Sequence, residues 1–112
     1  MKTYQEVALA FGWHVIRKEW EAARELFTID LRASTSAQDL EEQVREMIAY
    51  AEDELSQAEV ITDMEVWPDK EEHDVGWAYV ALSGDTFSEA ATVIVKKEGD
   101  QLLIRSIEWG RP

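Results

Sequence analysis

The amino-acid sequence predicts an α+β domain in which three N-terminal helices pack on a four-stranded antiparallel sheet. Apolar residues recur at helical spacing through the first half of the chain. The last third, from Asp74 to Pro112, instead contains three segments rich in Val, Ile, Thr and aromatic residues, separated by Gly84-Asp85 and Gly99-Asp100. Both pairs are typical of tight turns, because glycine supplies the positive φ that short hairpin loops need. The 112 residues contain no internal repeat and no linker, which indicates one domain over residues 1–112.

Three helices are expected before the sheet. The first covers Thr3 to Arg17 and the second covers Glu19 to Phe27, each with apolar side chains on one face. The third runs from about Ala37 to Leu55 after a polar break. Ser36, followed three residues later by Asp39, resembles a capping box, which favours a helix start at that point. The glutamates on the opposite face of the third helix are expected to face solvent.

Four strands are expected after the helices. Ala58 to Trp67 alternates apolar and polar residues and ends at Pro68, which indicates the first strand. The other three are residues 74–83, 86–98 and 101–112. Two-residue loops at both glycine pairs would place four pairs of residues opposite each other: Val80 and Glu89, Ala78 and Ala91, Val95 and Ile104, and Ala91 and Glu108.

This register divides the sheet into an aliphatic and an aromatic face, because side chains alternate along a strand. The aliphatic face is expected to pack on the helices and carries Ala78, Val80, Leu82, Phe87, Glu89, Ala91, Val93, Val95, Leu102, Ile104 and Glu108. The aromatic face carries Trp77, Tyr79, Ala90, Thr92, Ile94, Arg105, Ile107 and Trp109. Its Trp, Tyr and Arg content is typical of a protein interface. We therefore expect a homodimer formed through Trp77, Tyr79, Ile94, Arg105, Ile107 and Trp109. A one-residue bulge would exchange the faces beyond it, and the aromatic cluster would then line a pocket.

The charge of the chain excludes several classes of partner. There are 24 acidic and 11 basic residues, with a formal net charge of −13. Nucleic acids and anionic membranes need clustered Lys and Arg, so neither is an expected partner. The N-terminus has charged residues close to a short apolar run, and no segment approaches the roughly 20 apolar residues of a spanning helix. We therefore expect a soluble, cytoplasmic protein without a signal peptide.

No cofactor and no metal ion are expected. There are no cysteines, and hence no thiolate metal site. The glycines are scattered and none begins a predicted helix, so nothing resembles a phosphate-binding loop. The acidic loop at residues 69–74, which contains His73, lacks the glycine and the ligand spacing of a calcium loop. We interpret it as a solvated loop.

Two stretches resemble the nuclear transport factor two-like superfamily, which includes ketosteroid isomerases and scytalone dehydratase. FGWHVIRKEWEAARELF (residues 11–27) is similar to that group's pattern of helix, turn, aromatic residue and Ala-Ala, and EGDQLLIRSIEWGRP (residues 98–112) is similar to its final strand. The resemblance implies a cone-shaped, cystatin-like α+β fold with a curved sheet. It also implies a pocket between the helices and the concave sheet face, and a dimer formed through the convex face. The isomerase-type pairing of Tyr and Asp has no counterpart, because His14 and Phe11 stand where a first-helix Tyr is expected.

Four residues are candidates for proton-transfer chemistry. Glu89 and Glu108 would lie on the aliphatic face of neighbouring strands, where an apolar surface raises the pKa of a carboxyl group. Alternatively, they reach water at one end of the sheet or pair with an Arg of the helices. His14 is a candidate base, and otherwise a boundary residue with one hydrogen bond. Tyr50 is a candidate ligand contact, and otherwise packs a helix on the sheet.

These observations lead to one expected function and two alternatives. We expect a homodimeric binding or interaction domain that holds a small apolar ligand or a protein partner's segment. The first alternative is a small enzyme of the proton-transfer type, an isomerase, dehydratase or hydrolase, with Glu89 or Glu108 as base and His14 or Tyr50 as its partner. The second, which follows from the net charge, is an acidic protein that blocks a basic partner.

Overall fold

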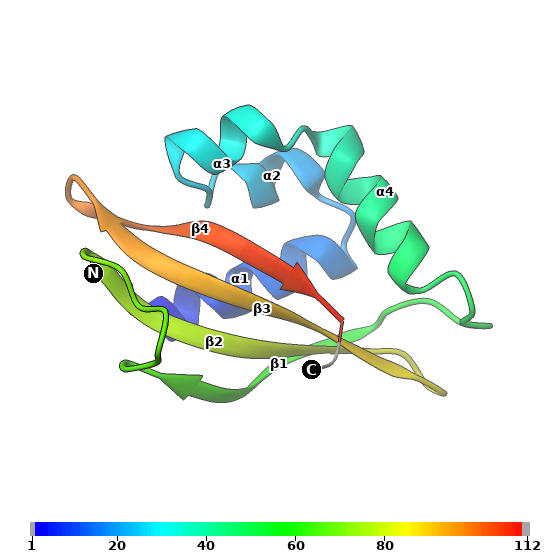
Figure 1. Ribbon diagram of the computed structural model, residues 1–112. Helices are drawn as coiled ribbons and strands as arrows, with labels where there is room; N and C mark the ends of the chain where they lie inside the picture. Colours follow the sequence, from blue (N-terminus) through cyan, green and yellow to red (C-terminus); the bar gives the residue numbers. More distant parts are fainter. Residues whose placement is uncertain (1, 111–112) are drawn as a thin grey trace.

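The computed structural model describes residues 2–110, which form four helices and four strands in one α+β fold. In chain order these elements are α1 (Tyr4–Ile16), α2 (Trp20–Arg24), α3 (Ile29–Ser34), α4 (Ala37–Met47), β1 (Gln57–Met64), β2 (Asp74–Ser83), β3 (Ser88–Glu98) and β4 (Gln101–Trp109). The strands form one curved antiparallel sheet in the order β1-β2-β3-β4, and the four helices lie on one side of it (Figure 1). The α+β class and the four-stranded antiparallel sheet are confirmed. Met1, Arg111 and Pro112, the last two from the predicted final strand, lie outside the described residues.

α1 packs directly on the sheet. Thr3 caps the helix, because its hydroxyl accepts the N–H of Glu6 while the Glu6 carboxylate accepts the N–H of Thr3. A Cβ atom at Gly12 would lie 3.0 Å from both the Cβ of Ala58 and the Cγ1 of Val80. Glycine at this position therefore lets the helix approach β1 and β2 closely.

The predicted second and third helices have different bounds in the structure. The helix predicted over residues 19–27 is the shorter α2, and α3 follows where no helix was predicted. The side chain of Thr28 caps α3 by accepting the N–H of Leu31. α4 begins after Ser36, and the capping box with Asp39 is confirmed. The predicted end at Leu55 is wrong, since α4 ends eight residues earlier.

Asp53 explains why the third predicted helix ends early. Its carboxylate accepts hydrogen bonds from the backbone N–H groups of Asp85 and Thr86 and from the Thr86 hydroxyl, all in the loop between β2 and β3. The hydrogen bond from the Thr86 hydroxyl contributes most to lowering the pKa of Asp53 below its usual value. A continued helix would also place the acidic run at residues 52–54 at the negative end of the helix dipole. The chain therefore leaves the helix and reaches the sheet.

The loop that Asp53 binds has four residues, 84–87, instead of the predicted two. Ser83 and Ser88 are the closing pair of the hairpin. Val80 consequently lies opposite Ala91 rather than Glu89, so the predicted register between these strands is wrong by two residues. A shift of two keeps each side chain on its predicted face, because side chains alternate with a period of two.

The turn at Gly99-Asp100 has the predicted two residues. Glu98 and Gln101 close it, and Gly99 has φ of 61°. The predicted pairing of Val95 with Ile104 is confirmed. This part of the register therefore follows from local turn chemistry.

A bulge at Arg105 inverts the faces of the last part of β4. The pairing between β3 and β4 shifts by one residue at this point, so Ala91 lies opposite Trp109 instead of Glu108. Ile107 and Trp109 therefore face the helices, where they pack against the core, and Glu108 faces away from them. The predicted faces of these three residues are wrong, because one extra residue reverses the alternation beyond it.

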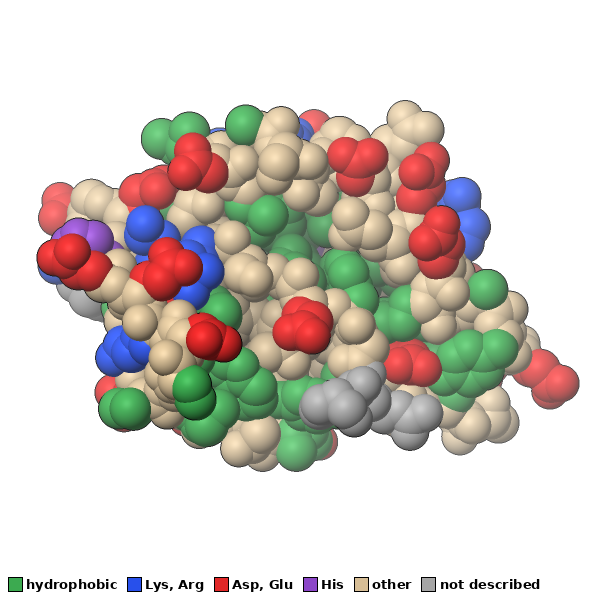
Figure 2. Space-filling model, viewed as in Figure 1, with side chains coloured by type: hydrophobic (Ala, Val, Ile, Leu, Met, Phe, Trp, Pro, Cys, Tyr) green, Lys and Arg blue, Asp and Glu red, His purple; other side chains and the backbone are tan. Residues whose placement is uncertain are grey.

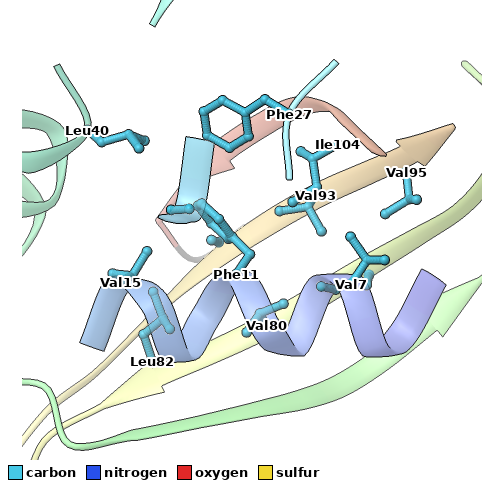
Figure 3. Close-up of a cluster of buried hydrophobic side chains, with 14 of the residues drawn as sticks. Val7, Phe11, Val15, Phe27, Leu40, Val80, Leu82, Val93, Val95 and Ile104 are labelled. Atoms are coloured by element: carbon cyan, nitrogen blue, oxygen red, sulfur yellow. The ribbon is translucent and has the colours of Figure 1, made fainter. Parts of the chain in front are cut away.

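Buried side chains fill the middle of the space between the helices and the sheet. The largest fully buried ones are Phe11, Phe27, Leu40, Leu82, Ile104, Val15, Val80, Val93 and Val95 (Figure 3). The ring centroid of Phe11 lies 6.0 Å from that of Phe27 and 5.8 Å from that of Trp109. Core side chains thus occupy the region in which the resemblance places a pocket.

Tyr4 joins the start of α1 to β1 and makes the fold sensitive to alkaline pH. It is 6% exposed, and its hydroxyl donates to Oδ1 of Asp63 at 2.8 Å. Burial and the neighbouring Asp63 carboxylate raise the pKa of Tyr4 from 10.0 to about 12. The unfolded chain releases this proton near pH 10 and the folded chain near pH 12. The stabilisation is therefore complete below pH 10 and is lost as the pH rises toward 12.

Replacing Tyr4 with phenylalanine is expected to weaken this alkaline dependence. Between pH 9 and pH 11.5 the free energy of unfolding should fall by about 2 kcal/mol more in the wild-type protein than in Tyr4→Phe. Urea unfolding of both proteins across this pH range measures the difference. Parallel pH dependences in the two proteins would contradict the assignment to Tyr4.

Candidate functional site

The face of the sheet away from the helices is the main candidate site. We call it the open face, and in β2, β3 and β4 it comprises Trp77, Tyr79, Ala81, Ala90, Thr92, Ile94, Lys96, Leu103, Arg105, Ser106 and Glu108. No helix of residues 2–110 covers it (Figure 1). Of the six predicted interface residues, Trp77, Tyr79, Ile94 and Arg105 lie on this face. Ile107 and Trp109 do not, because the bulge turns them toward the helices.

The middle of the open face is poor in charge. Trp77, Tyr79 and Ile94 are half-buried, and the outward positions of β2 from residue 77 to residue 83 carry no charged side chain. Charged residues make up 31% of the whole chain, and Figure 2 shows acidic side chains spread over much of the visible surface. A face with few carboxylates is therefore a distinctive feature of a chain with a net charge of −13.

An ion pair holds Arg105 at one end of the open face. Its Nε and Nη2 donate to the two carboxylate oxygens of Asp74, each at 2.7 Å, and its Nη1 lies 3.3 Å from Oε2 of Glu71. The Asp74 side chain is only 1% exposed and also accepts the N–H of Glu71 at 2.8 Å. Burial raises the pKa of Asp74, but the hydrogen bonds from Arg105 and from the Glu71 N–H outweigh it and hold that pKa below its usual value.

This ion pair gives Arg105 a structural role that the sequence did not reveal. A bidentate contact between guanidinium and carboxylate fixes both side chains. The ion pair joins β2 to β4 across β3. Arg105 is the extra residue of the bulge in β4. The one sequence signal for the partner was a carboxylate at the first position of an otherwise apolar strand, Asp74 to Ser83.

Tyr50 and Glu89 are the two predicted site residues that the fold brings together. The Tyr50 hydroxyl donates to Oε2 of Glu89 at 2.6 Å, and its ring packs edge-on against Phe87 with centroids 6.0 Å apart. Tyr50 is 60% exposed, so the pair lies at the surface. Glu89 lies opposite Leu82, on the helix-facing side of the sheet. The contact joins the segment after α4 to the start of β3.

The other two catalytic candidates lie elsewhere. Glu108 is on the open face and Glu89 is on the opposite face, so the predicted pair of carboxylates does not form. His14, in the last turn of α1, has its Nδ1 2.9 Å from Oε1 of Glu19 and is a boundary residue. The four candidates therefore occupy three separate places.

A cleft of about 180 Å³ lies at one end of the helical layer. It is bounded by the end of α1, the start of α2, α4 and the segment that precedes β1. Its apolar lining includes Val15, Trp20, Val44 and Leu55. Two exposed ion pairs belong to the same wall: Lys18 with Glu54 at 3.1 Å, and Arg45 with Glu41 at 3.6 Å. The cleft has the volume of a small apolar group and lies beside the filled core, not within it.

Neither a metal site nor a membrane-spanning helix is found among the residues that the structure describes. Among residues 2–110, no group of three His, Asp or Glu side chains is placed to hold a metal ion, and His73 is an exposed loop residue. Within the same range, no helix has both the length and the apolar character needed to cross a membrane.

Comparisons of the chain with family models, with curated proteins and with solved structures find no match.

Proposed function

We propose that this chain is a homodimeric interaction domain that pairs with a second copy of itself through the open face. The observation that carries the proposal is the half-buried strip of Trp77, Tyr79 and Ile94 on a side of the sheet without a helical cover in the described chain. Aromatic and aliphatic side chains in the middle of a surface, with charge toward its margins, are typical of interface cores.

The open face has the dimensions that one stable interface needs. Its strands contain 8 to 11 residues. At a strand spacing of about 4.8 Å and a rise of about 3.3 Å per residue, the sheet measures roughly 19 Å by 30 Å. Side chains enlarge the accessible area beyond this plane. The result is on the order of the 800 Å² that each partner of a standard interface buries.

The low charge of the open face makes it the surface on which a second copy would meet the least repulsion. Two molecules that each carry a net charge of −13 repel one another, and the repulsion is smallest where charge-poor surfaces meet. The charges of this side of the sheet lie toward its margins: Lys96, Glu108, Glu59 of β1, and Arg105 in its ion pair with Asp74. In a twofold interface the same patch meets itself, so a patch with a charge-poor middle avoids placing like charges against each other there.

The fold proposed for this domain is the nuclear transport factor two-like cone. Support comes from the order of helices before strands, the curved antiparallel sheet and the placement of the helices on one side of it. Dimers of that fold meet through the convex sheet face, which here corresponds to the open face. Ligand binding, which the resemblance places between the helices and the sheet, stays a prediction, and the cleft beside Trp20 is the observation that supports it.

Replacing Ile94 with glutamate is expected to dissociate the dimer. The new carboxylate would lie in the middle of the charge-poor strip, and the dimer dissociation constant should rise by at least about tenfold. Sedimentation equilibrium of the wild type and of Ile94→Glu at micromolar concentrations measures the change. Circular dichroism shows whether the variant is folded.

The matched control is Ile29→Glu. Ile29 is 73% exposed on α3, away from the open face, and the substitution makes the same change of side chain and of charge. This variant should dimerise like the wild type. A wild-type protein that is monomeric at about 100 μM would contradict the proposal, because standard interfaces associate far below that concentration. Equal effects of the two substitutions would also contradict it.

A further inference from the structure

β1 is an edge strand whose outer side has no neighbour among the described residues. It pairs with β2 alone, and it borders the sheet in Figure 1. By contrast, residues 26–28 cover part of the opposite edge: the N–H of Thr28 donates to the carbonyl of Ile104 at 2.9 Å, and the N–H of Ile104 donates to the carbonyl of Leu26 at 2.7 Å. The free N–H and C=O groups of an edge strand are a template for another strand.

Exposed apolar side chains cluster on and just after this edge. Ile61 is 55% exposed, Met64 is 38% exposed and Val66 is 79% exposed. These are three of the five large hydrophobic side chains that the described chain exposes most. An added strand would bury part of this apolar surface, and its backbone would form hydrogen bonds with the free N–H and C=O groups of β1.

The same edge is strongly acidic. Glu59, Asp63 and Glu65 are exposed, and residues 46–69 contain eight carboxylates but no Lys or Arg. Asp63 accepts the Tyr4 hydroxyl and, at 3.3 Å, the side-chain amide of Gln5, which are neutral donors. Lys70, which directly follows this run, donates to the carbonyl of Glu65 at 2.7 Å, so a basic side chain lies beside Glu65, whereas residues 46–69 themselves supply no cation to the edge.

This acidity argues against self-pairing through β1. In an antiparallel pair of two β1 strands centred on Ile61, Glu59 of one copy would lie opposite Asp63 of the other. Like charges directly opposite each other destabilise a strand pair. The edge therefore discriminates against a second copy, whereas a basic strand would meet complementary charge.

We infer that the free edge of β1 binds an extended, basic segment of a partner protein, which adds to the sheet as a fifth strand. The segment alternates Lys or Arg with apolar residues. Its backbone pairs with Gln57–Met64 on either side of the irregularity between Val60 and Thr62. Its cations lie beside the carboxylates of this edge, Glu59 among them, and its apolar residues lie beside Ile61. The inference concerns the edge of the sheet, whereas dimerisation concerns its open face, and Glu59 and Met64 lie on the margin that the two share. Their tests differ, because sedimentation reports dimerisation and peptide binding reports strand capture, so each can fail independently.

A labelled eight-residue peptide of alternating lysine and valine, acetylated and amidated, tests this inference by fluorescence anisotropy. We expect binding, and at least about tenfold weaker binding for the same peptide with glutamine in place of lysine. A peptide that is N-methylated at every residue keeps the charge but cannot pair with a strand, and it should also bind at least about tenfold more weakly. Hydrogen exchange should slow at residues 57–64 when the peptide binds, and not in β4.

Two double variants with the same net charge separate the edge from general electrostatic attraction. Glu59→Gln with Glu65→Gln removes charge at β1, whereas Glu25→Gln with Glu42→Gln removes it from the exposed helical surface. The first should weaken peptide binding by about fivefold or more and the second by less than about twofold. Equal losses in the two variants, tight binding of the N-methylated peptide, or no binding of the lysine–valine peptide would overturn the inference.

Discussion

Replacing Phe11 with alanine should lower the free energy of unfolding by about 3–5 kcal/mol. Phe11 is fully buried and lies close to Phe27 (Figure 3). The centroid of its ring lies 6.0 Å from that of Phe27 and 5.8 Å from that of Trp109. These contacts join α1, the segment before α3 and β4, so the cavity would form where three parts of the chain meet. Urea unfolding monitored by circular dichroism measures the loss. Since domains are stable by only about 5–15 kcal/mol, the variant should be close to unfolded at room temperature.

Trp13→Ala on the same helix is the control for this prediction. Trp13 is half-buried, and the Arg17 guanidinium lies 5.4 Å from its ring centroid. Its removal takes away a similar aromatic side chain without opening a closed cavity, so the loss should be about half as large or less. Equal losses at the two positions would show that Phe11 is not at the centre of the core.

Replacing Arg105 with methionine should cost about 3–5 kcal/mol of unfolding free energy, because it leaves the carboxylate of Asp74 buried and unpaired. The Asp74 side chain is 1% exposed, and the two bonds from Arg105 are its shortest contacts. Arg45→Met is the matched control. Arg45 is 67% exposed in its pair with Glu41, and its replacement should cost less than about 1 kcal/mol.

The pH dependence of this loss identifies its cause. In the wild type the pKa of Asp74 lies below its ordinary value, so the pair's stabilisation is present above the unfolded-state pKa and is lost as the pH falls through the folded-state pKa. In Arg105→Met the buried carboxylate would titrate above its ordinary value, so the destabilisation should be largest near pH 7 and smaller near pH 3. A loss independent of pH would contradict this explanation.

A double variant completes the test of the ion pair. Asp74→Asn removes the charge but keeps an oxygen that can accept the N–H of Glu71. Combined with Arg105→Met, it should recover a large part of the lost stability, because no unpaired charge remains buried. If the double variant is less stable than Arg105→Met alone, the buried charge is not the main cost.

Local sequence patterns predicted the elements that depend on neighbouring residues. The capping box at Ser36 and Asp39, the two-residue turn at Gly99-Asp100 and the bounds of β2 were all correct. Each depends on contacts within a few residues. The aromatic residues Trp77, Tyr79 and Ile94 were correctly placed on one face for the same reason, because side chains alternate regularly along an unbroken strand.

The candidate catalytic pair failed because its geometry depends on a distant contact. Glu108 follows the bulge at Arg105, and that bulge accompanies the ion pair with Asp74, which comes 31 positions earlier in the chain. Alternation predicts the faces on each side of a bulge but gives no sign of the bulge itself.

The α+β class, the two-residue turn and the aromatic strip could be predicted from the amino-acid sequence, because hydrophobic periodicity and glycine conformation are local properties. The end of α4, the length of the β2–β3 loop and the direction of the Trp109 side chain became visible only in the folded chain. The first two follow from the hydrogen bonds of Asp53 to Asp85 and Thr86, and the third from the Arg105 bulge. These depend on side chains that meet only when helices and strands have already packed together.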